Sequence, residues 1–201
     1  MTEPKRKSHK ASPALGRLLV NPLRQVFLLS PDKVFKDIQS SPVEVWADLG
    51  CGSGYFTIPL ARLVARVYAV DISDGMLAIL KERMEKGRVD NIELVQNTES
   101  SIPLPDQCLD GALIGFAAHE LDDPEKFFLE LARLLKQNGR LYIIEFAKVR
   151  SLGPPFDHRL SPEQVDQWAL EAGLAKGRSW KWSRTIVGWE YIKMNSNYFI
   201  R

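Results

Sequence analysis

The chain has 201 residues, is 45% hydrophobic and carries a formal net charge of +2. That length suffices for one α/β domain with a sizeable core and is cramped for two. Cys51 and Cys108 form no metal-ligand spacing and no disulfide framework, and no apolar run approaches the length of a membrane span. We therefore expect a cytoplasmic protein without a metal site or a membrane span.

Residues 1–12 lack apolar periodicity and are predicted to form a disordered leader. Lys and Arg dominate the first 24 residues, whereas the remaining chain has a small acidic excess. A basic leader can contact nucleic acid or an anionic surface, but a solvated leader has the same composition. Residues 13–40 then show apolar residues near helical spacing, and Ser30 with Pro31 predicts a helix start that runs to about Ile38.

Strands and helices alternate from residue 41 onward, which is typical of a largely parallel sheet with helices on both faces. The predicted strands are 43–49, 66–71, 92–96, 109–115, 139–146, 175–183 and 185–193. The predicted helices between them are 55–64, 75–86, 124–136 and 162–172. The segment 147–160 contains Gly153, Pro154 and Pro155, which predicts a long irregular loop, and such loops are more often functional than idle.

Three alternate glycines, Gly50, Gly52 and Gly54, follow the first predicted strand. Glycine tolerates positive φ and lets a ligand approach the backbone, and the start of the following helix would point free N–H groups at that ligand. The dinucleotide fingerprint G-x-G-x-x-G has its third glycine where this chain has Tyr55, which disfavours NAD and FAD. We interpret the loop as a cofactor cradle.

The run from Asp48 to Gly54 resembles the D-x-G-x-G-x-G motif of class I S-adenosylmethionine-dependent methyltransferases. The segments 102–110 and 113–146 are similar to the quinone-biosynthesis branch of that superfamily, so the resemblance spans about residues 43–160. It implies a Rossmann-like three-layer sandwich whose seven-stranded sheet is mostly parallel with the last strand antiparallel. It also implies a helical lid over 13–40, a methyltransferase domain over 41–201, and S-adenosylmethionine as methyl donor, with S-adenosylhomocysteine as product. Plain packing of 13–40 against the sheet is the alternative to a lid.

Asp71 ends the second predicted strand, 19 residues after Gly52. Its two carboxylate oxygens suit a ribose diol, although an acid here also suits the start of the next helix. Thr98 occupies the place where the family usually has an aspartate that contacts adenine, and Glu99 stands beside it. The predicted cofactor-binding residues are Asp48, Leu49, Gly50, Cys51, Gly52, Gly54, Tyr55, Asp71, Ile72, Met76, Thr98, Glu99 and Phe116.

His119 follows the fourth predicted strand and is a candidate general base, because imidazole titrates near neutral pH. A structural histidine that holds the loop is the alternative. The other predicted substrate-pocket residues are Glu120, Glu145, His158 and Arg159. Arg159 could bind an anionic group of the acceptor or form a surface salt bridge.

The C-terminal region interleaves aromatic and basic residues from Trp180 to Phe199. The alternation favours two antiparallel edge strands with one buried face over a surface that stacks on RNA bases. A single domain without an RNA-binding module favours a small-molecule methyl acceptor. The alternatives are an RNA or protein methyltransferase and a nucleoside-binding module that has lost catalysis.

Overall fold

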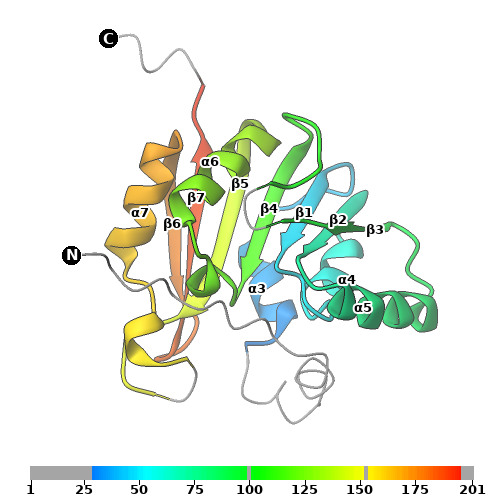
Figure 1. The fold of residues 1–201 in the computed structure, drawn as a ribbon, viewed down its shortest axis with the longest axis horizontal. Coiled ribbons are helices and arrows are strands. Elements are labelled where there is room, and N and C mark those ends of the chain that lie inside the picture. The colour runs from blue at the N-terminus through cyan, green and yellow to red at the C-terminus, as the bar shows by residue number, and fades with distance from the viewer. Residues whose placement is uncertain (1–28, 99–100, 152–153, 196–201) are drawn as a thin grey trace.

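The computed structural model describes residues 29–98, 101–151 and 154–195, and these form one sheet of seven strands in the order β3-β2-β1-β4-β5-β7-β6 (Figure 1). The strands are β1 (Val45–Leu49), β2 (Arg66–Asp71), β3 (Ile92–Gln96), β4 (Leu109–Gly115), β5 (Leu135–Phe146), β6 (Leu174–Lys181) and β7 (Ile186–Lys193). Neighbours pair in parallel except that β7 is antiparallel to both β5 and β6. The predicted sheet, with its last strand antiparallel, is thereby confirmed.

One expectation about the end of the sheet is wrong. The sequence predicted that both C-terminal strands lie at the edge, but β7 lies between β5 and β6, so of these two strands only β6 is an edge strand. Four consecutive residues of β7, from Gly188 to Tyr191, are buried, because the strand is covered on both faces and hydrogen-bonded on both sides.

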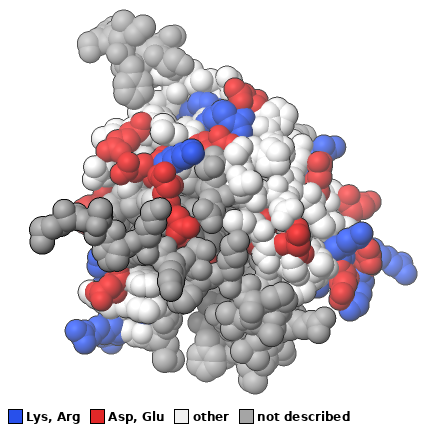
Figure 2. Space-filling model, in the orientation of Figure 1, with Lys and Arg blue, Asp and Glu red and all other residues white. Residues whose placement is uncertain are grey.

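The helices are α3 (Pro31–Asp37), α4 (Thr57–Ala61), α5 (Asp74–Gly87), α6 (Pro124–Leu134) and α7 (Pro162–Glu171), with short 3₁₀ helices η1 (Ala118–Glu120) and η2 (Phe156–His158). Side chains at their N-termini fix where several of them begin. Asp123 accepts a hydrogen bond from the Lys126 amide at α6, and Ser161 forms a capping box with Gln164 at α7. Acidic and basic side chains mix on the surface toward α5, at the right of Figure 2.

Helix α4 is shorter than the predicted 55–64. Gly54 precedes it in a left-handed conformation, and Pro59 has no amide hydrogen to bond the carbonyl one turn earlier. Strand β5 is longer than predicted, since it begins at Leu135 and takes up its extra residues at a register shift opposite β4.

Helix α3 is confirmed where the sequence predicted a helix after Ser30, and it ties the N-terminal part to the last hairpin. The Trp182 indole donates to Asp37 over 2.5 Å, and the Lys33 ammonium donates to the Trp182 carbonyl over 3.1 Å. The predictions for 1–12 and 13–28, and those for Glu99, Gly153, Tyr198 and Phe199, lie outside the described residues.

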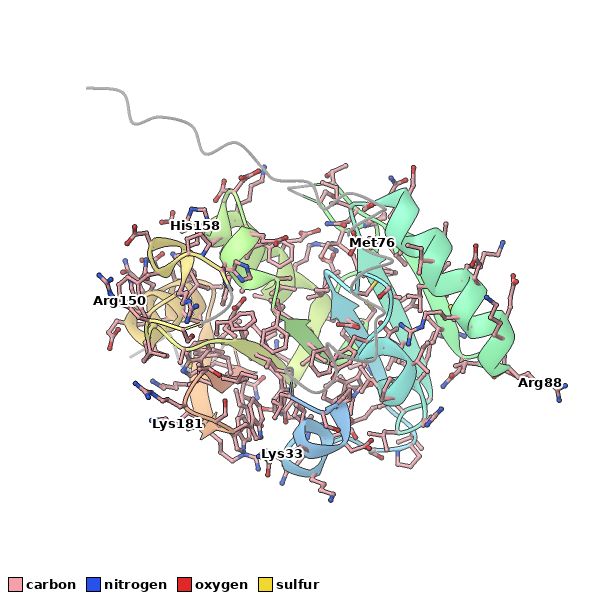
Figure 3. All side chains as sticks on the ribbon, turned by 90° about the horizontal axis from the view of Figure 1, so that it is seen from below. Lys33, Met76, Arg88, Arg150, His158 and Lys181 are labelled. Carbon is pink, nitrogen blue, oxygen red and sulfur yellow. The ribbon has the colours of Figure 1, made fainter. Side chains whose placement is uncertain are left out.

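The carboxyl ends of β1, β2, β4, β5 and β6 lie at one edge of the sheet, because these strands run in the same direction. Figure 3 looks onto this edge, which we call the carboxyl edge. Met76 labels the side of the edge near β2, and Arg150, His158 and Lys181 label the opposite side. Ligands of open α/β sheets bind at such an edge.

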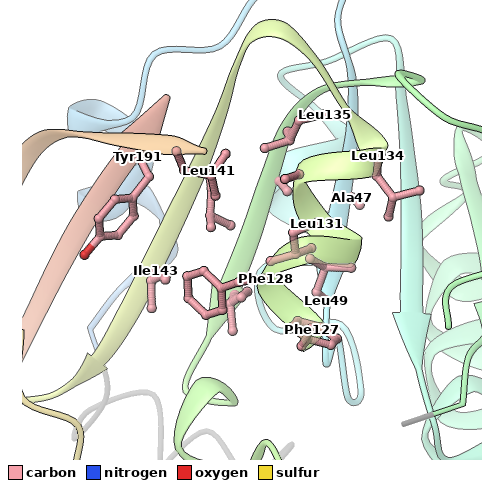
Figure 4. Packing of buried hydrophobic residues seen from close by; sticks show 14 of the residues in the cluster. Ala47, Leu49, Phe127, Phe128, Leu131, Leu134, Leu135, Leu141, Ile143 and Tyr191 are labelled. Atoms are coloured by element: carbon pink, nitrogen blue, oxygen red, sulfur yellow. The ribbon is translucent and has the colours of Figure 1, made fainter. Parts of the chain in front are cut away.

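Two clusters of buried side chains fix this arrangement, one on each face of the sheet. The first contains the predicted stripe of α6, including Phe127, Phe128 and Leu131, packed on β4, β5 and β7 (Figure 4). The second packs α3, α4 and α5 against the other face. No helix within the described ranges is long and apolar enough to cross a membrane.

Candidate functional site

The glycine loop after β1 adopts the backbone conformation for which the sequence selects glycine. Gly50, Gly52 and Gly54 have φ of 67°, 52° and 83°, a left-handed region that other residues rarely enter. The amides of Gly50 and Cys51 both donate to the Val70 carbonyl, at 2.8 and 3.0 Å, so the loop turns back over β2.

The three glycines differ in what surrounds them. A Cβ on Gly54 would lie 2.3 Å from Leu80 Cδ1, and one on Gly50 would lie 2.7 Å from Ala117 Cβ, so both positions are closed by packing. A Cβ on Gly52 would meet nothing within 4 Å. Gly52 is therefore the point at which a ligand can approach the loop backbone.

Asp71 connects this loop to the end of β2. Its Oδ2 accepts from the Gly52 amide and its Oδ1 from the Ser73 amide, both at 2.8 Å. Burial raises the pKa of Asp71, although these backbone hydrogen bonds oppose the rise. Ser73, and not Asp71, caps α5 through its side chain. Each carboxylate oxygen keeps a lone pair for a further donor.

The side chains flanking Asp71 divide into exposed and buried. Ile72 is 38% exposed, whereas Met76 is only 3% exposed. Ile72 thus offers apolar surface at the carboxyl edge, whereas Met76 is part of the buried core. Thr98 is exposed and pairs with Ser101 in an isolated bridge.

Asp48 links the strand before the glycine loop to the helix after it. Its side chain is buried, and the Thr57 hydroxyl donates to its Oδ2 over 2.6 Å, which joins the two ends of the loop. Burial raises the pKa of Asp48 to about 7, and the charge of Asp71 contributes. Leu49 and Cys51 are likewise buried, so at these positions the backbone is what the loop offers a ligand.

Aromatic rings line the carboxyl edge beyond the loop. Tyr55 donates from its hydroxyl to the Leu29 carbonyl over 3.2 Å. Phe116, with φ of 58°, contacts Phe146 at 4.8 Å and Phe56 at 6.1 Å between ring centroids. Phe146 was not a predicted site residue, although its place at the end of β5 is a signal that could have found it.

His119 and Glu145, predicted separately, form a dyad. His119 Nδ1 lies 3.0 and 3.1 Å from the two carboxylate oxygens of Glu145. Glu145 is buried and also accepts from the backbone amides of His119 and Phe146. The geometry assigns the proton to Nδ1 and leaves Nε2, which lies 3.8 Å from Glu120 Oε1, as the acceptor.

The charge around the imidazole favours its protonated form. Burial lowers the pKa of His119, but the hydrogen bond and charge of Glu145, together with the charge of Glu120, outweigh it. The net pKa therefore lies above the usual 6.5.

Arg159 is buried inside the loop that follows β5, so it does not lie at the surface as predicted. Its guanidinium donates to the carbonyls of Ala147, Val149, Ser151 and Pro154 at 2.6–3.0 Å and lies 5.8 Å from the Phe146 ring centroid. The guanidinium that was predicted to bind an anionic group of the acceptor is thus hydrogen-bonded to carbonyls of its own loop. His158 is exposed in η2 (Figure 3).

Known proteins resemble this chain over the same region. A model of the family described as a methyltransferase domain matches residues 47–143. The curated Ubiquinone/menaquinone biosynthesis C-methyltransferase UbiE of Pasteurella multocida is 36% identical over 50% of this chain and 39% of its own length. The enzyme of that name from Marinomonas sp. is 33% identical over 65% of this chain and 51% of its own length. The chain therefore spans about half the length of the curated relatives it matches.

A solved structure is similar over a longer range. The SAM dependent methyltransferase from Aquifex aeolicus is 30% identical, with a TM-score of 0.85, and the similarity covers 92% of this chain and 100% of that one. The predicted resemblance to class I methyltransferases of the quinone-biosynthesis type is thereby confirmed. This chain belongs to the class I S-adenosylmethionine-dependent methyltransferases.

Proposed function

We propose that this chain transfers a methyl group from S-adenosylmethionine to a small-molecule acceptor. One observation carries the proposal. A Cβ on Gly50 would contact Ala117, two residues before His119, so the glycine loop and the His119–Glu145 dyad adjoin at the carboxyl edge. A donor and an acceptor bound at these neighbouring places would lie beside each other.

The described residues fit the cofactor. Gly52 offers an open backbone, the Asp71 carboxylate keeps lone pairs for the ribose hydroxyls, and Ile72 offers exposed apolar surface for the adenine ring. The Thr98 hydroxyl lies on the next strand's loop and is a further candidate for adenine. When bound, the cofactor supplies an already activated methyl group on a sulfonium sulfur, so the protein mainly positions the partners and excludes water.

The charge of this region also fits a cationic ligand. Burial raises the pKa of Asp48, the Thr57 hydrogen bond opposes the rise, and the charge of Asp71 adds to it. Burial likewise raises the pKa of Glu120, the charge of His119 opposes the rise, and the charges of Glu145 and Asp71 add to it. These carboxylates therefore repel one another in the folded protein. A positive charge bound among them relieves the repulsion.

His119 is the residue that takes a proton from the acceptor. Glu145 fixes the tautomer by accepting from Nδ1, which leaves Nε2 free to accept a proton from the nucleophile. Because the pKa of His119 is raised, the neutral form needed for this role prevails only at a pH above that raised value. Glu145, Glu120 and Arg159 are the charged groups that act on the imidazole.

A small molecule suits the elements around the site. The curated relatives are named for ubiquinone and menaquinone biosynthesis, whose acceptors are small molecules. The C-terminal tryptophans are engaged inside the fold, since Trp189 is buried and the Trp182 indole is bonded to Asp37, which disfavours stacking on RNA. The free thiols of Cys51 and Cys108 support a cytoplasmic location.

Calorimetry tests the cofactor, with NAD as the comparison ligand. We expect S-adenosylmethionine to bind and NAD not to bind; the opposite result would refute the proposed function. Release of S-adenosylhomocysteine, assayed against a panel of small phenolic and quinol acceptors, then tests transfer. Binding without transfer to any acceptor would support the nucleoside-binding alternative.

The dyad is tested by NMR titration of the three histidine side chains, with His119→Gln used for assignment. The imidazole of His119 should titrate above 6.5, and Glu145→Gln should lower its midpoint, because the carboxylate charge that raises it is removed. An active enzyme should gain activity as pH rises through the same midpoint. An unshifted midpoint in Glu145→Gln, or full turnover in His119→Ala, would contradict the base.

A further inference from the structure

A groove of about 470 Å³ lies at the other end of the carboxyl edge from the glycine loop. Val187 and Trp189 of β7 line it, Leu160 and Pro162 of the segment entering α7 form one side, and Lys148 and Lys181 stand at its rim. We call it the β7 groove. Its lining is more apolar than polar, and nothing in the cofactor site uses it.

The groove lies on the same face of the sheet as Glu145 of the dyad. In the antiparallel pair β5–β7, Glu145 stands opposite Val187 and Ile143 opposite Trp189. Directly opposed residues of such a pair project to the same face, with Cα atoms about 4.5–5.5 Å apart. Glu145, which binds His119, therefore projects to the same face of the sheet as Val187 and Trp189, which line the groove.

The rim of the groove is cationic. Lys148 and Lys181 are exposed, and neither has a carboxylate within 4.0 Å in the part of the chain that the structure describes. Lys148 instead lies 6.0 Å from the Phe156 ring centroid. Two lysines above an apolar floor match a ligand that carries an anionic group on an apolar body.

We propose that the β7 groove binds the methyl acceptor, and that this acceptor joins an apolar, ring-sized body to one anionic group. The body packs on Val187 and Trp189, and Lys148 and Lys181 bind the carboxylate, sulfonate or phosphate. The nucleophile then faces His119 along the same face of the sheet. This inference rests on the proposed function, since it names the acceptor class of that site.

The probe is 1-anilinonaphthalene-8-sulfonate, an aromatic body with one sulfonate, compared with its uncharged analogue N-phenyl-1-naphthylamine. Each is titrated by fluorescence into the full chain, with and without S-adenosylhomocysteine, so that binding in the cofactor site is recognised. We expect the lysine variant Lys148→Gln/Lys181→Gln to bind the anionic probe at least tenfold more weakly and the neutral probe unchanged. The matched control Lys81→Gln/Lys86→Gln removes two exposed lysines of α5 and should change neither.

A blocking variant tests the apolar floor. Ser179 is exposed on β6 and lines the groove, so Ser179→Trp should fill it and weaken both probes while the chain still folds. Val187→Phe is the second blocking variant, and thermal unfolding checks each fold. Equal anionic-probe affinity in the lysine variant, or unchanged titrations in both folded blocking variants, would overturn the inference.

The cofactor measurement separates this failure from failure of the proposed function. All groove variants should bind S-adenosylmethionine as the wild type does, because none of them touches the glycine loop. Loss of the groove effects with cofactor binding intact refutes the groove alone. Absence of cofactor binding in the wild type refutes the proposed function.

Discussion

The two halves of the carboxyl edge are built by different means. The donor half, at the ends of β1 and β2, is shaped by backbone conformation. Of its three left-handed glycines, Gly50 donates to the Val70 carbonyl, Gly52 to the Asp71 carboxylate and Gly54 to the Cys51 carbonyl. The proposed acceptor half, around the end of β5, is shaped by side chains: the His119–Glu145 dyad, the buried Arg159 and the β7 groove. The family match ends at residue 143, before Glu145 and the groove. The matched residues thus include the glycine loop, Asp71 and His119, but not Glu145 or the β7 groove.

The strongest test of the donor half is to add one methyl group to each of two loop glycines, Gly54 and Gly52. Gly54→Ala should prevent cofactor binding and lower the free energy of unfolding, because its Cβ would lie 2.3 Å from Leu80 at a φ of 83°. Gly52→Ala should cost only about 1–2 kcal/mol of left-handed strain but weaken binding about a hundredfold or more, since its methyl fills the open side. Calorimetry and urea unfolding measure the two effects.

Gly87→Ala is the matched control, because its Cβ would only reach ordinary contact with Val89 at the end of α5. Wild-type affinity in a folded Gly52→Ala protein would place the cofactor elsewhere.

The buried acid of the donor half gives a pH test of stability. Asp48 has a pKa of about 7 when folded against 3.8 as its ordinary value, so between these values the folded state holds a proton that the unfolded state lacks. Raising the pH from 4 to 7 should therefore lower the free energy of unfolding of the wild type relative to Asp48→Asn, by on the order of 4 kcal/mol. Urea unfolding at several pH values measures this, and parallel curves for the two proteins would show that Asp48 does not titrate there.

Asp71→Ala tests the donor half with a smaller expected loss of cofactor affinity. It should weaken cofactor binding by about 2 kcal/mol, roughly thirtyfold, through loss of the ribose contact. It should also reduce stability, because the amides of Gly52 and Ser73 lose their acceptors. Asp74→Ala, an exposed acid three residues on, is the control for charge, and calorimetry is the measurement. Unchanged affinity in Asp71→Ala would refute the ribose role.

The sequence predicted the donor half better than the acceptor half, for a physical reason. The bounds of β2, β3 and β4 agree residue for residue with the prediction. The positive φ of the three loop glycines was also predictable, because both features depend on local sequence. The partnership of His119 with Glu145 joins η1 to the end of β5 across 26 positions of sequence, and no local pattern encodes it. The inside place of β7 and the burial of Arg159 depend likewise on tertiary packing.

Arg159 holds together the loop that follows β5. The loop after β5 has little regular structure to satisfy its carbonyls, and one guanidinium gathers four of them, so the side chain acts as a noncovalent crosslink that holds the loop closed. Lysine offers a point charge without the planar fork and cannot replace it. The conformational entropy of this loop is thus restricted largely by one buried side chain.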